Sequence, residues 1–352
     1  MTLEMLSDAM TPRPTDSTRP SPRRDSSRRR SRRGPSEALP GASDSTIAVR
    51  PGAESAELEA LSERRTTPPP PPPAGSRLPV IAERFRMLNI VGYGSYGLVF
   101  RGREVRSGEP VAIKILKSDC AGDPLIEGQW RREQELAATL RISGAPRGIA
   151  AGDDLLHGSR VSYLVTELIA GQNLKDWRGG LAEVERAEVY NIARGMAEAL
   201  GQLRSLAIIH RDIKPGNVMR TESGKIKVMD FGLHRRLDQP APESPEKLVG
   251  TPQYMAPEHI AGDSGSFAGD IYAFACTLFF VITGDAPFTG PGVADVLRSH
   301  RRDPFPPLPE PWQDSPFEDL LREMSAKDPG DRPTIRTIQR RLADPDDPLQ
   351  TA

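Results

Sequence analysis

Three short polar segments carry residues whose types and spacing suit the handling of phosphate groups. They are GYGSYG at residues 92–97, HRDIKPGN at 210–217 and DFG at 230–232. Glycines let a backbone approach a phosphate closely and offer N–H groups to it. The carboxylates and the amide of the later segments can orient a hydroxyl nucleophile and bind a hard cation such as Mg²⁺. Together the three segments predict phosphoryl transfer from a nucleotide.

A lysine in an apolar strand adds to this prediction. Lys114 lies within Val111–Leu116, and a buried ammonium group needs a partner of opposite charge. The helix expected at 125–141 offers Glu133 on the same side as its apolar residues, whereas the competing Glu135 faces away. Taken alone, the pair could also be a purely structural ion pair.

Hydrophobic patterning supplies the elements that must position these groups. Strands are expected at 86–91, 97–101 and 110–116, then in two further apolar runs of which the second is 161–168, and a short one at 225–229. Helices are expected at 125–141, at 187–206, from Asp270 onward and at the C-terminal end, where Ile335, Ile338 and Leu342 form an inward stripe. The order predicts an α+β fold, with a small antiparallel sheet and one helix before a mostly helical part.

The three segments, in this order, resemble those of the eukaryotic-type (Hanks-type) protein serine/threonine kinases, bacterial branch. The resemblance extends from about Phe85 to Leu342. It implies a bilobal kinase domain at 85–343, with an N-lobe at 85–169 and a C-lobe at 170–343. It also implies ATP and Mg²⁺ as cofactors, with Mn²⁺ as an alternative metal, and proteins as substrates.

The resemblance implies a role for each site residue. Asp212 would accept or orient the proton of the substrate hydroxyl, and Lys214 would offset charge on the γ-phosphate. The implied catalytic residues are Asp212, Lys214, Lys114 and Glu133. The implied metal ligands are Asn217 and Asp230. The implied nucleotide contacts are Val91, Gly92, Gly94, Ser95, Tyr96, Gly97, Val99, Ala112, Lys114, Glu167, Ile169 and Met219.

A later segment, GTPQYMAPE at 250–258, resembles the substrate-docking part of these kinases. By that resemblance Thr251 should bond Asp212 and Lys214, and Glu258 should pair with Arg332. Asp270 should brace the backbone at residues 210 and 211. We expect these contacts to be structural.

The chain outside the domain is predicted to be a disordered tail at 1–80 and a short tail at 344–352. The first carries an Arg-rich stretch at 19–33 and a proline run at 68–73, and few apolar residues. It could be an autophosphorylated, partner-binding arm or simply a spacer. Transient self-association for autophosphorylation is a further expectation.

Composition and charge bear on the partners and the cellular compartment of the protein. The net charge of −1 indicates neither a specific nucleic acid nor a membrane as partner. The longest apolar run, 271–282, is too short to span a bilayer. Two cysteines, Cys120 and Cys276, suit reduced thiols and hence a cytoplasmic protein.

Two other functions remain alternatives. A pseudokinase usually lacks one of the three residues that Lys114, Asp212 and Asp230 represent here. A small-molecule phosphotransferase is disfavoured by APE at 256–258 and DRP at 331–333. Ser244 is the one hydroxyl between Gly232 and Thr251. Its phosphorylation, or the flanking Glu243 and Glu246 carboxylates acting in place of a phosphate, is expected to order this loop.

Overall fold

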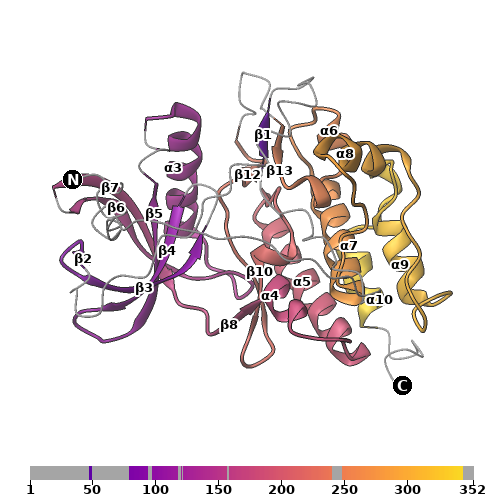
Figure 1. Cartoon of the computed structure of the whole chain (residues 1–352), viewed down its shortest axis with the longest axis horizontal. Helices are drawn as coiled ribbons and strands as arrows, with labels where there is room; N and C mark the ends of the chain where they lie inside the picture. Colours follow the sequence, from indigo (N-terminus) through magenta and orange to yellow (C-terminus); the bar gives the residue numbers. More distant parts are fainter. Residues whose placement is uncertain are drawn as a thin grey trace, which may run out of the picture.

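The computed structural model describes residues 47–49, 79–93, 97–117, 120, 122–156, 158–239 and 248–343. The predicted disordered tail at 1–80 lies outside the described residues, apart from 47–49 and 79–80, and the tail at 344–352 lies outside them too. Ser244 also falls outside. The described chain forms a sheet-rich part followed by a mostly helical part, as expected for α+β (Figure 1).

The N-terminal part is a six-stranded antiparallel sheet in the order β2-β3-β4-β5-β7-β6. Its strands are β2 (Val80–Ile81), β3 (Phe85–Tyr93), β4 (Gly97–Glu104), β5 (Pro110–Leu116), β6 (Gly148–Leu156) and β7 (Ser159–Glu167). One face forms a core that includes Ile81, Phe85, Ile113 and Val165, each at most 1% exposed. The predicted strands are present, and β2 adds to them.

Helix α3 (Pro124–Thr139) packs against this sheet. It begins where Asp123 accepts a hydrogen bond from the backbone N–H of Leu125 at 2.8 Å, which caps an end that would otherwise leave donors unsatisfied. The Nε1 atom of buried Trp130 donates to Ser162 Oγ on β7 at 2.8 Å. This hydrogen bond fixes the helix against the strand.

The C-terminal part is built around α5 (Arg186–Ser205) and α7 (Phe267–Thr283). The other helices are α4 (Leu174–Gly179), α6 (Pro257–Ile260), α8 (Val293–Arg302), α9 (Pro316–Met324) and α10 (Ile335–Leu342). Tyr190, Tyr272 and Phe317 are among the largest fully buried side chains. Because α7 is covered on nearly all sides, its apolar run is a core helix. Among the described residues, no helix is long and apolar enough to cross a membrane.

The start of α7 differs from the expectation. Ser266 caps the helix by accepting from the backbone N–H of Gly269 at 3.1 Å, so the helix begins at Phe267. Asp270 therefore lies within the first turn instead of opening the helix.

Short strands connect the two parts and carry the loops of interest. β8 (Gly171–Asn173), β10 (Val218–Thr221) and β11 (Ile226–Val228) form a three-stranded sheet. β9 (Ile208–Ile209) pairs with β12 (Arg235–Arg236), and β13 (Leu248–Gly250) pairs with β1 (Ile47–Val49). The last pairing was not predicted, because β1 lies in the segment expected to be disordered.

Candidate active site

The Asp212 carboxylate is the centre of a buried cluster of polar side chains. Thr251 Oγ1 donates to Asp212 Oδ1 at 2.8 Å, and Asn217 Nδ2 donates to Oδ2 at 2.9 Å. Lys214 Nζ lies 2.9 Å from the same Oδ2 and donates to Thr251 Oγ1 at 2.8 Å. All four residues are at most 7% exposed. The predicted contacts of Thr251 with Asp212 and Lys214 are confirmed.

The backbone that carries this cluster is held by Asp270 of α7. Its carboxylate accepts from the backbone N–H groups of His210 and Arg211, each at 2.8 Å, as predicted. Burial raises the pKa of Asp270 despite these donors. Arg211 has φ = 70°, a left-handed conformation that is uncommon for a residue with a side chain. Asp270 thus stabilises a strained turn directly before Asp212.

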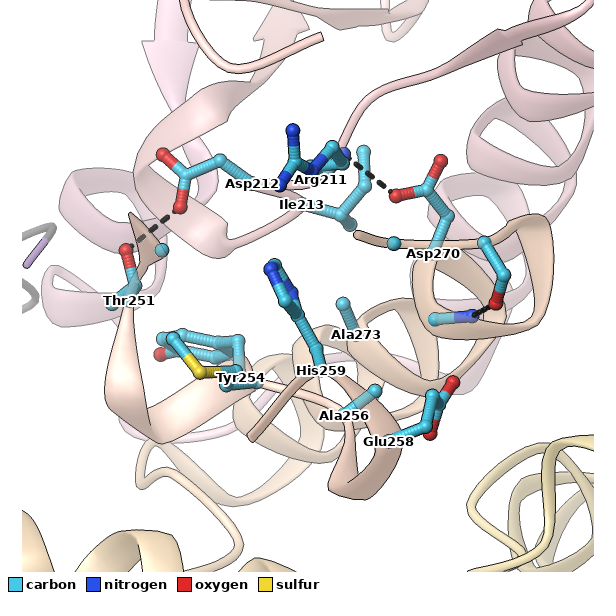
Figure 2. Close-up of a pocket in the computed structure, with 15 residues that line it drawn as sticks. Arg211, Asp212, Ile213, Thr251, Tyr254, Ala256, Glu258, His259, Asp270 and Ala273 are labelled. Carbon is cyan, nitrogen blue, oxygen red and sulfur yellow. Dashed lines mark hydrogen bonds between the residues drawn. The ribbon is translucent and has the colours of Figure 1, made fainter. Parts of the chain in front are cut away.

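Figure 2 shows a small cavity beneath this loop, lined by residues that include Arg211, Tyr254, Glu258 and His259. Its volume is about 20 Å³, enough for roughly one water molecule and far too small for a nucleotide. The predicted partner of Glu258 is present: Arg332 Nη1 and Nη2 donate to its two carboxylate oxygens at 2.7 and 2.8 Å. The cavity is therefore no nucleotide site, and the Arg332–Glu258 pair anchors the segment that lines it.

Asp230 is brought to the same cluster by backbone pairing. Val228 pairs with Val218 between β11 and β10, and the backbone N–H of Met229 donates to the Asn217 carbonyl at 2.7 Å. Asp230 follows directly and has φ = 57°, again left-handed. The strand pair thus places the predicted metal ligands Asn217 and Asp230 near each other.

Lys114 joins the N-terminal sheet to this centre. Its Nζ lies 2.7 Å from Glu133 Oε1 on α3 and 2.8 Å from Asp230 Oδ1. The predicted pair with Glu133 is confirmed, and Glu135 is exposed on the opposite side of the helix. The contact with Asp230 was not predicted, since sequence reasoning gave that carboxylate only to the metal.

The three charges perturb one another. Burial opposes the charged form of Lys114, but Asp230 and Glu133 outweigh it and raise the pKa of the ammonium group. Burial raises the pKa of Glu133, which Lys114 only partly offsets. Burial also opposes the ionised form of Asp230, yet the neighbouring Lys114 lowers its pKa to about 2. We therefore take Lys114 and Asp230 to be charged at neutral pH.

Three predicted nucleotide contacts lie side by side across neighbouring strands. Gly92 of β3 pairs with Val99 of β4, and Val99 pairs with Lys114 of β5. On β5, Lys114 and Ala112 are only partly buried, while the residues between and beside them are buried, so both lie on the face opposite the core. Lys114 therefore lies on the face of the sheet that is turned away from the N-terminal core.

The start of β4 leaves no space for a side chain at Gly97. A Cβ atom there would lie 2.9 Å from the Ile115 carbonyl oxygen and 3.2 Å from Cγ of Lys114. Any larger residue would push against the strand that carries the lysine. Val91 is half exposed at the end of the same hairpin. Gly94, Ser95 and Tyr96 lie outside the described residues, so their predicted phosphate contacts remain predictions.

The remaining predicted nucleotide contacts lie where β7 ends and on β10. Glu167 closes β7 and its side chain forms an ion pair with Lys227 of β11, a contact that sequence reasoning missed. Met219 on β10 is the strand partner of Lys227. Ile169 follows β7 and is partly buried. The roles of Glu167, Ile169 and Met219 toward adenine remain predictions.

The side chains present fit a magnesium ion that is bound together with a nucleotide. Mg²⁺ is usually held by one or two carboxylates plus substrate phosphates. Asp230 supplies a carboxylate, and Asn217 directs its amide nitrogen to Asp212, which turns its amide oxygen away from that residue. Among the described residues, no group of three His, Cys, Asp or Glu side chains could hold a metal without such help.

These features define a protein kinase. An antiparallel sheet with one helix precedes a helical part, and the Lys114–Glu133–Asp230 contacts lie beside the cluster of Asp212, Lys214 and Asn217. Comparison with known families agrees: the model for the protein kinase domain matches residues 85–342. The chain belongs to the protein kinase family, and the resemblance inferred from its motifs is confirmed.

Several relatives of the chain are bacterial kinases. The serine/threonine-protein kinase PknB of Mycobacterium leprae is 32% identical over 231 residues, covering 65% of this chain and 37% of that kinase. The probable serine/threonine-protein kinase PknB of Corynebacterium glutamicum is 34% identical over 231 residues, 65% of this chain and 36% of the relative. The serine/threonine-protein kinase PknA of Mycobacterium tuberculosis is 30% identical over 230 residues, 65% of this chain and 53% of the relative. The matches thus span about a third to about half of these relatives.

Proposed function

We propose that this chain transfers the γ-phosphoryl group of ATP to serine or threonine hydroxyls of proteins. The observation that carries the proposal is the environment of Asp212, whose carboxylate is fixed by Thr251, Asn217 and Lys214 at 2.8–2.9 Å. A carboxylate held this rigidly can receive a hydroxyl proton without first rearranging. Relatives named as serine/threonine-protein kinases support the same acceptor class.

Each side chain then has a separate task. Asp212 orients the attacking hydroxyl and takes its proton, while the Lys214 ammonium group 2.9 Å away favours charge developing on the transferred phosphoryl group. Lys114, held by Glu133, binds and orients the phosphates of ATP. A bound Mg²⁺ would neutralise phosphate charge, and Asn217 and Asp230 are the residues that would hold it.

The pseudokinase alternative finds little support in this arrangement. Lys114, Asp212 and Asp230 are all present, and each makes the charged contacts described above. We also propose that the kinase phosphorylates itself and acts in cytoplasmic signalling. Free thiols at Cys120 and Cys276 are compatible with a reducing compartment.

The test is transfer of label from [γ-³²P]ATP to dephosphorylated casein in the presence of Mg²⁺, with wild type beside Asp212→Asn. Removing the carboxylate charge should lower the rate by about 10²–10³-fold. Asp285→Asn makes the same chemical change at an exposed position and should match wild type. Circular dichroism should show that all three proteins are folded. Equal labelling by wild type and Asp212→Asn would refute the proposal.

A further inference from the structure

Three exposed arginines share one face of the N-terminal sheet. Arg86 of β3 is directly opposite Arg103 of β4, and Arg101 comes two residues before Arg103 on the same strand. Alternate residues of a strand point to the same side, and directly opposite residues of paired strands do so too. We refer to Arg86, Arg101 and Arg103 as the arginine face.

The charges of the arginine face are not neutralised within the described part of the chain. There, none of the three guanidinium groups forms an ion pair, and Arg103 donates only to a backbone carbonyl of the β4–β5 turn, at 3.0 Å. Glu104, the next residue on β4, is bound instead by Arg84 and Ser107, each at 2.6 Å. Like charges directly opposite each other destabilise a strand pair, so an anion bound between Arg86 and Arg103 would relieve their repulsion.

Two exposed valines flank the arginine face. Val80 of β2 is the cross-strand partner of Arg86 and is 37% exposed. Val105 directly follows β4, two residues after Arg103, and is 49% exposed. β2 is the edge strand of its sheet, so this corner of the molecule is open on one side. Basic and apolar groups are therefore interleaved on one exposed surface, which suits a ligand that carries both carboxylates and apolar side chains.

The arginine face continues the surface that carries the predicted nucleotide contacts. Arg101 is directly opposite Ala112 of β5, and Val99, two residues earlier on β4, is directly opposite Lys114. Because a strand rises about 3.3 Å per residue, Arg101 and Arg103 lie about 7 and 13 Å along β4 from Val99. A ligand on the arginine face would thus lie beside the proposed nucleotide site without occupying it.

We propose that the arginine face docks an acidic segment of a protein substrate, in which carboxylates alternate with apolar residues. The inference rests on the kinase activity proposed above, because docking would raise the concentration of the tethered acceptor near Asp212. The carboxylates pair with the guanidinium groups, which favour planar two-point contacts, and the apolar residues contact Val80 and Val105.

An acidic protein segment fits this surface better than a single-stranded nucleic acid does. Nucleic-acid grooves combine positive charge with exposed aromatic rings on which bases stack. Here the aromatic rings next to the arginines in the sequence, Phe85 and Phe100, are 1% and 9% exposed and belong to the core on the other side of the sheet. The exposed apolar groups beside the arginines are valines, which contact aliphatic side chains.

The first experiment measures binding without ATP, by fluorescence anisotropy of a labelled peptide added to the full chain. The peptide consists of glutamates interrupted by one isoleucine and one leucine, and its matched control has glutamine in place of every glutamate. We expect the acidic peptide alone to bind, more weakly at higher salt. The triple variant Arg86→Gln/Arg101→Gln/Arg103→Gln should raise its Kd at least about tenfold, since each exposed ion pair contributes modestly.

The matched control variant removes three positive charges from exposed positions of the helical part. Arg301→Gln/Arg336→Gln/Arg340→Gln changes the net charge by the same amount and should bind the acidic peptide as wild type does. Circular dichroism and urea unfolding should show both triple variants to be folded, and loss of the Arg86–Arg103 repulsion should leave the arginine-face variant at least as stable as wild type. Equal weakening by the two triple variants would overturn the proposal.

The second experiment measures phosphorylation of a peptide with one serine, joined through a glycine linker to the acidic segment or to its glutamine counterpart. Docking should lower KM for the acidic form at least about tenfold without changing kcat, and the arginine-face variant should lose this difference. Its KM for ATP should equal that of wild type. A higher KM for ATP would place the arginines in the nucleotide site and overturn docking.

Casein phosphorylation, measured alongside, separates the possible failures. If wild type phosphorylates neither casein nor the serine peptides, the proposed kinase function fails and the binding experiment alone decides whether the arginine face takes an acidic segment. If wild type phosphorylates casein but shows no preference for the acidic peptide in binding or in KM, only this inference fails. Tighter binding of a single-stranded oligonucleotide than of the acidic peptide would also overturn it.

Discussion

The buried ion pair between Glu258 and Arg332 provides a quantitative test of how the segment at 250–258 is anchored. The Arg332 side chain is 0% exposed and that of Glu258 is 12% exposed. Arg332 uses its donors fully: two reach the Glu258 carboxylate, and the others reach the carbonyls of Ala326, Ala268 and Lys327. Glu258→Ala would leave a buried guanidinium with two unsatisfied N–H groups and no counter-charge.

The expected cost follows from that environment. Breaking one side of a buried pair typically costs about 3–5 kcal/mol. Arg332 also lies over the ring of Tyr272, 5.0 Å from its centroid, which retains some stabilisation of the cation. We therefore expect Glu258→Ala to lower the free energy of unfolding by about 3 kcal/mol, the lower end of that range. For a domain of this size, that corresponds to a fall in melting temperature of about 6–12 °C.

The assay is urea unfolding followed by tryptophan fluorescence and far-UV circular dichroism. The matched control is Glu323→Ala, which breaks an Arg–Glu pair of 2.6 Å to Arg341 whose side chains are 50% and 29% exposed. Exposed pairs contribute about 0–1 kcal/mol, so this variant should be nearly as stable as wild type. If Glu258→Ala costs no more than Glu323→Ala, the argument from burial is refuted.

Three further predictions test separate parts of the site and the fold. Thr251→Val removes the hydroxyl that donates to Asp212 and should lower kcat about 10–100-fold without changing nucleotide affinity, whereas an equal loss in Thr251→Ser would contradict the role of the hydroxyl. Burial lowers the pKa of His300 from 6.5 to about 3, so below pH 6.5 the unfolded chain binds a proton that the folded chain does not. As the pH falls from 6.5 toward 3, His300 should lower the free energy of unfolding by about 1.4 kcal/mol per pH unit, and urea titrations at several pH values should show His300→Gln losing that contribution relative to wild type. Ser162→Ala should cost about 1–3 kcal/mol in urea unfolding because it strands the Trp130 indole N–H, and the cost should largely vanish in a Trp130→Phe background.

The Lys114–Glu133 pair shows what patterning could establish. A lysine between buried strand residues requires a carboxylate, and the apolar stripe of α3 shows which glutamate faces inward. The contact of Lys114 with Asp230 was not accessible in the same way. It depends on how α3, β5 and the loop after β11 are placed against one another, which no local pattern encodes.

The backbone conformations at Arg211 and Asp230 were also not predictable from local preferences. Both residues have positive φ, although neither is glycine. Asp270 from a distant helix compensates the strain at Arg211 by accepting two backbone hydrogen bonds. Strain of this kind is set by tertiary contacts, so a reading of the sequence alone assigns such positions an ordinary turn.

Strand β1 was likewise not predictable from the composition of its own segment. Composition predicted disorder for residues 1–80 because few apolar residues are available to form a core. A strand does not need a core of its own when another strand supplies its hydrogen-bond partners. Here β13 supplies them, and its position before Thr251 is known only once the fold is known.

The proximity of the two predicted metal ligands, Asn217 and Asp230, could by contrast be expected from the sequence, because it depends on local geometry. β10 and β11 form an antiparallel pair between Asn217 and Asp230, and a backbone hydrogen bond from Met229 to Asn217 closes it. An antiparallel pair joined by a short turn returns the chain to its starting point, so the number of residues between the two ligands is fixed by the length of the pair. Spacing in the sequence therefore encodes proximity for Asn217 and Asp230. For Lys114 and Asp230, which no such strand pair connects, proximity depends on the assembly of the two parts of the domain.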